Sequence, residues 1–344
     1  MNGVTVAGTG TVAFLLATGG THVLGRLALR WGITDRPGGY KTHVRPVPYL
    51  GGIAIMLGTV VPALGLLGFS DPRTTAIAIG GIAIALLGLV DDISPLPKRT
   101  RLAVESLTAT GVVLSGVEAS ITRTWLDVPI TVVWIVVITN SFNLLDNMDG
   151  ALGAITLAGA TPLAVTAFAR GEYGAGLLLV TLAASGFGFL PHNWAPAKVF
   201  MGDAGSLFIG FTTACLAALL VTGEGTGTVM AGVLLPTFVA TVDTGVVTLS
   251  RRRAGRPVFQ GGADHVSHRL RRLGFGARLT ALLLAAVAGA SGTLGLASAL
   301  HWISPVVAVI AAIVSALVLI TLPQRVPIYS RPQPPPKVTY ERRP

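Results

Sequence analysis

Eleven apolar stretches, each close to the length that crosses a bilayer, run through most of the 344-residue chain. A transmembrane helix needs about 20 predominantly apolar residues, and a segment in lipid must satisfy its own backbone hydrogen bonds. The stretches lie near 4–29, 49–69, 74–90, 102–119, 126–142, 150–168, 174–192, 204–222, 228–249, 277–298 and 302–322. The pattern predicts an all-α, polytopic transmembrane helix bundle with about eleven spans, or ten, because the stretches 74–90 and 126–142 are short.

The distribution of charge predicts how these spans are oriented. Only 12% of the residues are charged, against about 25% in soluble domains. A net charge of +10 would suggest nucleic acid as the partner of a soluble protein, but here the basic residues gather in a few loops. Of the 25 Lys and Arg residues, only Arg73, Arg123 and Arg170 fall on one of the two sides of the membrane that the predicted spans define. Under the positive-inside rule the N-terminus is outside, the C-terminus is cytoplasmic, and no nucleic-acid partner is expected.

Two parts of the chain are expected to differ in order. Residues 1–322 form the membrane-embedded domain, with chemistry in its cytoplasmic loops, and residues 323–344 form a Pro-rich, basic tail. That composition predicts a disordered extension that contacts anionic membrane lipid. The sole cysteine, Cys215, excludes a disulfide within the chain and a thiol metal site.

Two adjacent acids, Asp91 and Asp92, follow the stretch 74–90 in the segment LLGLVDDISPLPKRTR. A helix C-terminus carries partial negative charge, so two acids there are unfavourable without a cation or a basic partner. Lys98, Arg99 and Arg101 could supply that partner or bind phosphates themselves. A solvated helix end is the structural alternative, but the position favours acids that bind a divalent cation or act as a base.

Two further acidic segments follow. Asn143, Asp146 and Asp149 are spaced i, i+3, i+6, and in a helix they would share roughly one face, closed by Gly150. This stripe favours a site over a merely polar membrane edge. Asp203 lies between glycines in FMGDAGS, directly before an apolar stretch. Glycines allow a close backbone approach and a helix N-terminus can hold a phosphate, although Asp203 taken alone is better explained as an ordinary N-cap.

Two basic loops complete the set. His265 and His268 in DHVSHR can face one way and are followed by Arg271 and Arg272, so they could donate hydrogen bonds to phosphate or ligate a metal. A basic loop that only anchors topology explains them equally well. The loop from Asp35 to Gly52 mixes fixed turns with cations and contains Lys41 and His43. A solvated linker is the alternative there.

All five loops lie on the same predicted side, and their mixture of acids, cations and imidazoles suggests a phosphorylated substrate bridged through a metal. A transporter or flippase for an anionic lipid intermediate is the rival from another class. It would predict acids within the spans and inverted repeats. Only Glu105 and Asp243 lie inside predicted spans.

Five ordered motifs carry a resemblance to the polyprenyl-phosphate N-acetylhexosamine-1-phosphate transferases. They are KTHVRPVPYLGG, LGLVDD, NLLDNMDGA, HNWAPAKVFMGDAGS and ADHVSHRLRRLGF, between about residues 30 and 275. The resemblance implies a membrane enzyme of glycosyltransferase family 4 type with about ten or eleven helices. Such enzymes transfer a sugar-1-phosphate from a UDP-sugar to a polyprenyl phosphate, with release of UMP. It also implies Mg²⁺, for which Mn²⁺ could substitute, and an inner-membrane enzyme whose site faces the cytoplasm.

The resemblance also implies roles for single residues. Asp203 resembles the Mg²⁺ ligand, and Asp91, supported by Asp92, resembles the group that activates the lipid phosphate. The residues expected to bind substrate are Lys41, His43, Asn143, Asp146, Asp149, Phe200, His265 and His268. Among these, Asp149 resembles a uridine contact, Phe200 the residue that packs on uracil, and the two histidines binders of diphosphate or sugar. A homodimer is compatible with the sequence.

The family has two bacterial branches. The phospho-N-acetylmuramoyl-pentapeptide transferase of peptidoglycan synthesis has three consecutive histidines in its last inner loop. The other branch transfers GlcNAc-1-phosphate or a related sugar phosphate and starts O-antigen, teichoic acid, enterobacterial common antigen or arabinogalactan linker synthesis. DHVSHRL resembles the second branch, with Ser267 where a histidine is usual, and Tyr40 replaces a common Arg. UDP-GlcNAc is the expected donor, with the muramoyl-pentapeptide nucleotide as the alternative.

Overall fold

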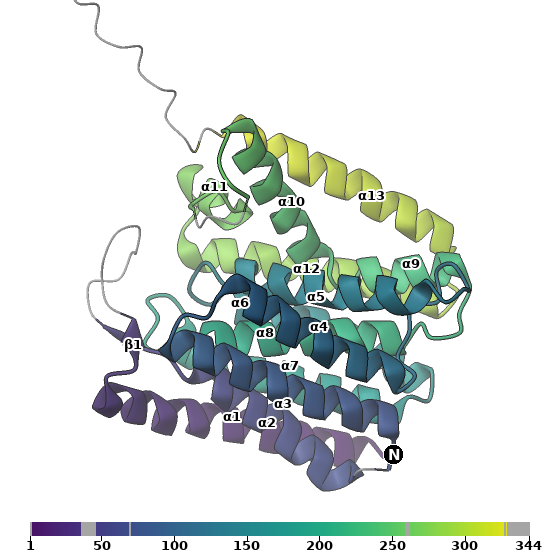
Figure 1. Ribbon diagram of the computed structural model, residues 1–344, viewed down its shortest axis with the longest axis horizontal. Coiled ribbons are helices and arrows are strands. Elements are labelled where there is room, and N and C mark those ends of the chain that lie inside the picture. Colours follow the sequence, from purple (N-terminus) through teal and green to yellow (C-terminus); the bar gives the residue numbers. More distant parts are fainter. Residues whose placement is uncertain (1, 36–45, 69, 259–261, 327, 329–344) are drawn as a thin grey trace, which may run out of the picture.

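The chain folds into an all-helical bundle in the computed structural model, which describes residues 2–35, 46–68, 70–258, 262–326 and 328. The long helices lie side by side, with connections at the two ends of the bundle (Figure 1). In the first half they are α1 (Gly3–Trp31), α2 (Gly51–Leu67), α3 (Pro72–Ile93), α4 (Lys98–Leu114), α5 (Asp127–Leu145), α6 (Ala151–Ala169) and α7 (Tyr173–Asn193). In the second half they are α8 (Gly202–Leu219), α9 (Thr226–Leu234), α10 (Phe238–Arg253), α11 (Val266–Arg272), α12 (Ala277–Ala299), α13 (Pro305–Thr321) and the short 3₁₀ helix η1 (Leu322–Arg325).

The all-α prediction is confirmed, whereas a count of about eleven spans is not. Within the described residues, eight helices are long and apolar enough to cross a membrane. The predicted stretch 49–69 becomes α2, an apolar helix of 17 residues. The stretch 102–119 becomes α4, a helix of 17 residues that begins with Lys98, Arg99 and Arg101 and contains Glu105, and it is not among the eight.

The predicted span 228–249 is two helices. α9 and α10 meet at an angle of 74° and would supply a ninth span if counted together. Pro236 lies at the break, where it lacks the N–H that a continuous helix would use. The hydroxyl of Thr237 donates back to the carbonyl of Val233 at 2.7 Å. A hydropathy average does not detect such a break because both halves are apolar.

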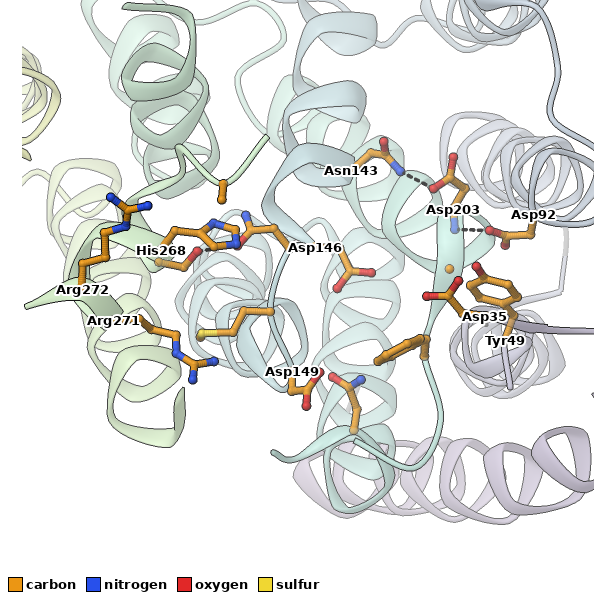
Figure 2. A pocket seen from close by; sticks show the side chains of 17 residues that line it. Asp35, Tyr49, Asp92, Asn143, Asp146, Asp149, Asp203, His268, Arg271 and Arg272 are labelled. Carbon is orange, nitrogen blue, oxygen red and sulfur yellow. Dashed lines mark hydrogen bonds between the residues drawn. The ribbon is translucent and has the colours of Figure 1, made fainter. Parts of the chain in front are cut away.

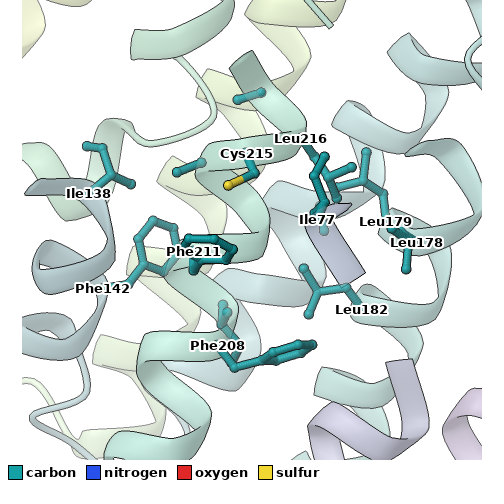
Figure 3. Close-up of a cluster of buried hydrophobic side chains, with 14 of the residues drawn as sticks. Ile77, Ile138, Phe142, Leu178, Leu179, Leu182, Phe208, Phe211, Cys215 and Leu216 are labelled. Atoms are coloured by element: carbon teal, nitrogen blue, oxygen red, sulfur yellow. The ribbon is translucent and has the colours of Figure 1, made fainter. Parts of the chain in front are cut away.

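Helix α8 lies at the centre of the bundle, with 16 of its 18 residues buried. Phe208, Phe211 and Cys215 project from it into a cluster with side chains of α3, α5 and α7 (Figure 3). Small residues make this packing close. A Cβ atom at Gly81 of α3 would lie 2.9 Å from the ring of Phe208. The first turn of α8 is therefore held firmly, and this turn carries Asp203.

The two ends of the bundle differ in character. Near one end, β1 (Thr34–Asp35) and β2 (Val47–Pro48) form an antiparallel pair that joins α1 to α2, and Thr34 pairs with Pro48. The N-terminus lies at the other end (Figure 1). Two of the three arginines predicted for that end are paired, since Arg73 lies 3.2 Å from Glu172 and Arg170 lies 2.8 Å from Glu224. Most of the predicted tail, 323–344, lies outside the described residues.

Candidate active site

A cavity of about 620 Å³ opens at the end of the bundle that carries β1 and α11. Helices α3 and α5 end there, and α6 and α8 begin there. One wall is acidic and the other is basic, with Asp146 between them (Figure 2). The charged and histidine side chains that line the cavity are Asp35, Asp92, Asp146, Asp149, Asp203, His268, Arg271 and Arg272.

Asp92 supplies the cap of α8 from a different helix. Its carboxylate accepts the backbone N–H groups of Asp203 at 2.9 Å and Ala204 at 3.1 Å. These are among the free N–H groups of a first helical turn, where the helix dipole favours negative charge. The contact therefore offsets part of the unfavourable position of Asp92 at the C-terminal end of α3, where partial burial also disfavours a charged carboxylate. Asp203 does not cap α8 itself but lies in its first turn.

Gly202 makes this approach possible. Its φ of +65° lies in the left-handed region, where a side chain is disfavoured. A Cβ atom at this position would also overlap the carboxylate of Asp92. Gly202 is thus required by the contact between α3 and α8. The close backbone approach that the sequence predicted for this glycine is an approach to the carboxylate of Asp92.

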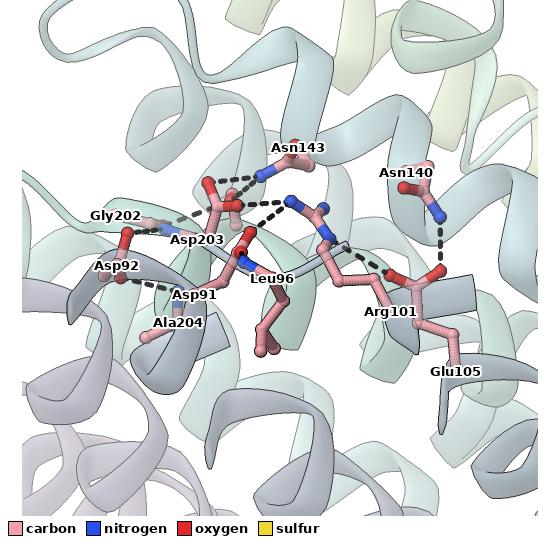
Figure 4. A network of polar contacts seen from close by, with 11 residues as sticks. Asp91, Asp92, Leu96, Arg101, Glu105, Asn140, Asn143, Gly202, Asp203 and Ala204 are labelled. Atoms are coloured by element: carbon pink, nitrogen blue, oxygen red, sulfur yellow. Dashed lines mark hydrogen bonds and ion pairs between the residues drawn. The ribbon is translucent and has the colours of Figure 1, made fainter. Parts of the chain in front are cut away.

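The carboxylates of Asp203 and Asp91 share one cation. Asp203 accepts the amide of Asn143 at 2.8 Å through Oδ1 and the guanidinium of Arg101 at 2.8 Å through Oδ2. The same Nη1 of Arg101 lies 2.5 Å from Asp91, which also accepts the N–H of Leu96. Figure 4 shows this network. The prediction that a basic residue after Asp91 supplies its partner is confirmed for Arg101.

The segment before α8 is attached to the start of α2. The N–H of Gly51 donates to the carbonyl of Phe200 at 3.1 Å, and the N–H of Phe200 donates to the carbonyl of Pro48 at 2.9 Å. Gly52 contacts the backbone of Gly205 too closely for a Cβ atom. These contacts place the Phe200 side chain on the cavity.

Asn143, Asp146 and Asp149 line the cavity together, but they do not share a helical face. Helix α5 ends at Leu145, and Asp146 has the non-helical ψ of 59°. Asp149 accepts the N–H of Ala197 at 2.9 Å. Burial, followed by the charges of Asp203 and Asp92, raises the pKa of Asp146 to about 7. The expectation of a continuous helical stripe was wrong, because the chain turns between α5 and α6 and still keeps all three side chains on one cavity.

The basic wall belongs to α11. His268, Arg271 and Arg272 face the cavity, and Nδ1 of His268 is buried with no hydrogen-bond partner among the described residues. Burial, followed by the nearby His265, lowers the pKa of His268 to about 4, so its ring is neutral at pH 7. Such a ring can donate one hydrogen bond and accept another.

His265 holds α11 in place from behind this wall. It is 4% exposed, and its Nδ1 lies 2.7 Å from Asp243 of α10, whose other oxygen accepts the N–H of Val266. A second buried pair joins Arg251 to Asp264 through two contacts of 3.0 Å. The two histidines that the sequence grouped together thus differ, since His268 lines the cavity and His265 is packed against α10.

Two cavity residues, Asp35 and Tyr49, were not among the predicted site residues. They lie at the two ends of the loop that contains Lys41 and His43, and β1 and β2 bring those ends together. Burial, followed by the carboxylate of Asp35, raises the pKa of the Tyr49 hydroxyl. The strand pairing of this loop was the missing signal. Lys41 and His43 lie outside the described residues.

The acidic wall fits a hard divalent cation shared with a phosphate ligand. Asp203, Asp92, Asp146 and Asn143 offer oxygen atoms, the donor type that Mg²⁺ prefers. The described residues contain no preformed group of three or more His, Cys, Asp or Glu ligands. Mg²⁺ does not need such a cage, because it is usually held by one or two carboxylates together with water and substrate phosphates.

Comparison with known proteins identifies the family. The family model described as glycosyl transferase family 4 matches residues 74–221. A Bacillus subtilis protein, "Probable undecaprenyl-phosphate N-acetylglucosaminyl 1-phosphate transferase", is 31% identical over 277 residues, which are 77% of this chain and 76% of that protein. The chain belongs to glycosyl transferase family 4. With eight apolar helices of spanning length in the part of the chain that the structure describes, this family member is a multi-pass membrane protein.

Other relatives of this glycosyl transferase differ in how much of it they match. The decaprenyl-phosphate N-acetylglucosaminephosphotransferase of Mycobacterium leprae is 29% identical over 316 residues, 80% of this chain and 79% of that protein. A phospho-N-acetylmuramoyl-pentapeptide-transferase of Clostridium botulinum is 26% identical over 215 residues, 56% of this chain and 66% of that protein. The muramoyl-type protein is therefore the more distant of these relatives.

Proposed function

We propose that this enzyme transfers N-acetylglucosamine-1-phosphate from UDP-GlcNAc to a polyprenyl phosphate, with release of UMP. The observation that carries the proposal is the cavity at one end of the membrane bundle, with carboxylates on one wall and His268, Arg271 and Arg272 on the other. A diphosphate bound through a cation on one side and arginines on the other matches both walls. The names of the similar proteins supply the acceptor and the sugar.

The residues of the chain have distinct tasks in binding the donor. Arg271 and Arg272 are exposed at the cavity and would bind the diphosphate, and the neutral ring of His268 would hydrogen-bond a phosphate or sugar oxygen. Phe200 offers an aromatic ring to the uracil, and Asp149 offers a carboxylate to the uridine. Asp203, with Asn143 and Asp146 nearby, would hold Mg²⁺. The cation would neutralise charge on the diphosphate and stabilise the departing UMP.

The reaction forms one P–O bond and breaks another. An oxygen of the lipid phosphate attacks the phosphorus that carries the sugar, and the bond to the bridging oxygen breaks, so the electron pair leaves with UMP. Both aspartates at the end of α3 already accept hydrogen bonds, Asp91 from Leu96 and Arg101 and Asp92 from the start of α8. This arrangement favours direct attack by the lipid phosphate, which is itself a nucleophile, over attack by an aspartate.

A compact sugar nucleotide is favoured over the muramoyl-pentapeptide donor. Ser267 occupies the position of the missing histidine, is 2% exposed, and donates a hydrogen bond to Asn147 at 2.5 Å. This bond ties α11 to the turn between α5 and α6, and both residues line the cavity. A site that reads hydroxyl groups by hydrogen bonds discriminates strongly against the wrong sugar, because unpaired polar groups are left behind.

The test is competition between UDP-GlcNAc and UDP-MurNAc-pentapeptide for undecaprenyl phosphate, with purified enzyme and Mg²⁺. We expect UMP release with the higher kcat/KM for UDP-GlcNAc, and loss of at least about 100-fold in kcat for Asp203→Asn, as for removal of an electrostatic catalytic group. Preference for the pentapeptide donor would select the alternative enzyme of this family. Absence of UMP release from either donor, with transbilayer movement of a lipid-linked sugar, would select a transporter.

A further inference from the structure

Glu105 is a carboxylate buried inside the bundle, one turn after Arg101 on α4. Its side chain is 1% exposed. Asn140 of α5 donates a hydrogen bond to Oε2, while Oε1 has no hydrogen bond among the described residues and lies 3.9 Å from Nε of Arg101. A buried charge without a partner is strongly unfavourable. Arg101 is therefore the cation that balances Glu105, and the two groups interact by charge attraction without a hydrogen bond between them.

Arg101 at the same time occupies an oxygen that a metal would need. Its Nη1 lies 2.8 Å from Oδ2 of Asp203 and 2.5 Å from Oδ2 of Asp91. The remaining oxygen of Asp203 accepts Asn143. Figure 4 shows the guanidinium with Asp203 and Asp91 on one side of it and Glu105 on the other. A cation that binds Asp203 through Oδ2 must therefore compete with Arg101.

We propose that Glu105, fixed by Asn140, is a positioning residue that sets this competition: it shares the charge of Arg101 and thereby makes Asp203 available to the divalent cation. This inference rests on the proposed metal site at Asp203. Without the charge of Glu105, Arg101 pairs with Asp91 and Asp203 alone and holds them more strongly. The field at the site also becomes less negative, and both effects weaken cation binding.

The sign of the effect distinguishes positioning from simple damage. Glu105→Gln keeps the size of the side chain and an acceptor for Asn140, so the packing between α4 and α5 is preserved. We expect it to weaken divalent-cation binding by about three- to tenfold. Arg101→Gln removes the competitor and should strengthen binding. In the double variant Arg101→Gln/Glu105→Gln, the loss caused by Glu105→Gln should become smaller than in the wild type, because the arginine through which it acts is absent.

The experiment measures Mn²⁺ alone, by the electron paramagnetic resonance signal of free Mn²⁺ titrated with purified full-length protein in detergent. In parallel, the Mg²⁺ dependence of UMP release should shift to higher concentration in Glu105→Gln, and high Mg²⁺ should restore its rate. Glu118→Gln is the matched control, since it makes the same substitution in the connection beyond the other end of α4. It should leave the Mn²⁺ dissociation constant unchanged.

Each result has a separate meaning. Wild-type protein that binds no Mn²⁺ would overturn the proposed metal site, and this inference with it. Normal wild-type binding with the same dissociation constant in Glu105→Gln would overturn the inference alone. If Glu105→Gln fails to fold, Asn140→Ala removes the hydrogen bond that fixes Glu105. Ser141→Ala is its control, because among the described residues the Ser141 hydroxyl bonds only to Val137 of its own helix. Unchanged binding in a folded Asn140→Ala would also overturn it.

Discussion

The side chain of Asp92 accepts the backbone N–H of Asp203 at 2.9 Å, although the two residues are 111 positions apart in the chain. The carboxylate that ends α3 therefore fixes the backbone of the residue proposed to bind the metal. The two aspartates have different tasks. Asp92 orients the first turn of α8, and Asp203 presents its side chain to the cavity.

Replacement of Asp92 by Asn is expected to reduce both stability and turnover. An amide can accept only one of the two N–H groups and brings its own NH₂ group against the other. The loss of a capping carboxylate is worth about 1–2 kcal/mol. Thermal unfolding in detergent should show a lower Tm, and kcat should fall. Asp91→Asn is the comparison for Tm, because among the described residues Asp91 accepts the N–H of Leu96 and the guanidinium of Arg101 and no backbone N–H of α8. An unchanged Tm in Asp92→Asn would contradict the capping role.

Asp146 should make the stability of the metal-free protein depend on pH. Its folded-state pKa is raised to about 7, so the native state keeps a proton that the unfolded chain loses near the ordinary pKa of 3.8. Stability from this group is therefore lost as pH rises between about 4 and 7. The Tm of Asp146→Asn minus that of the wild type should grow from pH 5 to pH 7 and then level off. A pH-independent difference, measured with EDTA present, would exclude a raised pKa.

Replacement of Asp243 should weaken binding of the sugar-nucleotide donor more than it slows the chemical step. Asp243 accepts the N–H of Val266 and contacts His265, and so it places the start of α11, which carries Arg271 and Arg272. We expect Asp243→Asn to raise KM for the UDP-sugar by about five- to twentyfold, as for a buried charged hydrogen bond, with a smaller change in kcat. Thr244→Val is the adjacent control, since the Thr244 hydroxyl has no hydrogen-bond partner among the described residues. A fall in kcat alone would mean that α11 acts in the chemical step.

The sidedness of the cavity can be tested with cysteines at the two ends of α3. Ser70 and Ser94 are both exposed, and Ser94 lies next to the cavity end. In a protein with Cys215 replaced, an impermeant thiol reagent applied to intact cells should label Ser70→Cys and not Ser94→Cys. The reason is the clustering of basic residues on the cavity side, which is expected to be cytoplasmic. Lysed cells supply the control in which both react. Labelling of Ser94→Cys in intact cells would invert the orientation.

The sequence predicted local features better than long-range ones. Apolarity alone located the helices, because a lipid-exposed backbone has little choice but to form them. The short separation of ten positions also indicated that Arg101 could lie near Asp91. The sequence could not predict that Asp92 caps α8, that Asp243 holds α11, or that Asp35 and Tyr49 reach the cavity, because these contacts depend on how distant segments pack. Pro236 was visible in the sequence, but its effect on the predicted span 228–249 was not anticipated.

The glycines beneath the acidic wall bear on how the specificity of this enzyme can be redesigned. A Cβ atom at Gly88 would lie 2.5 Å from the carbonyl group of Asp203, and Gly52 and Gly202 are equally confined. The basic wall is different, because Arg271 and Arg272 are exposed on a helix of seven residues. A library that randomises positions 271 and 272 can therefore explore new donors without altering the proposed metal site. Most substitutions at the glycines would instead be expected to prevent folding.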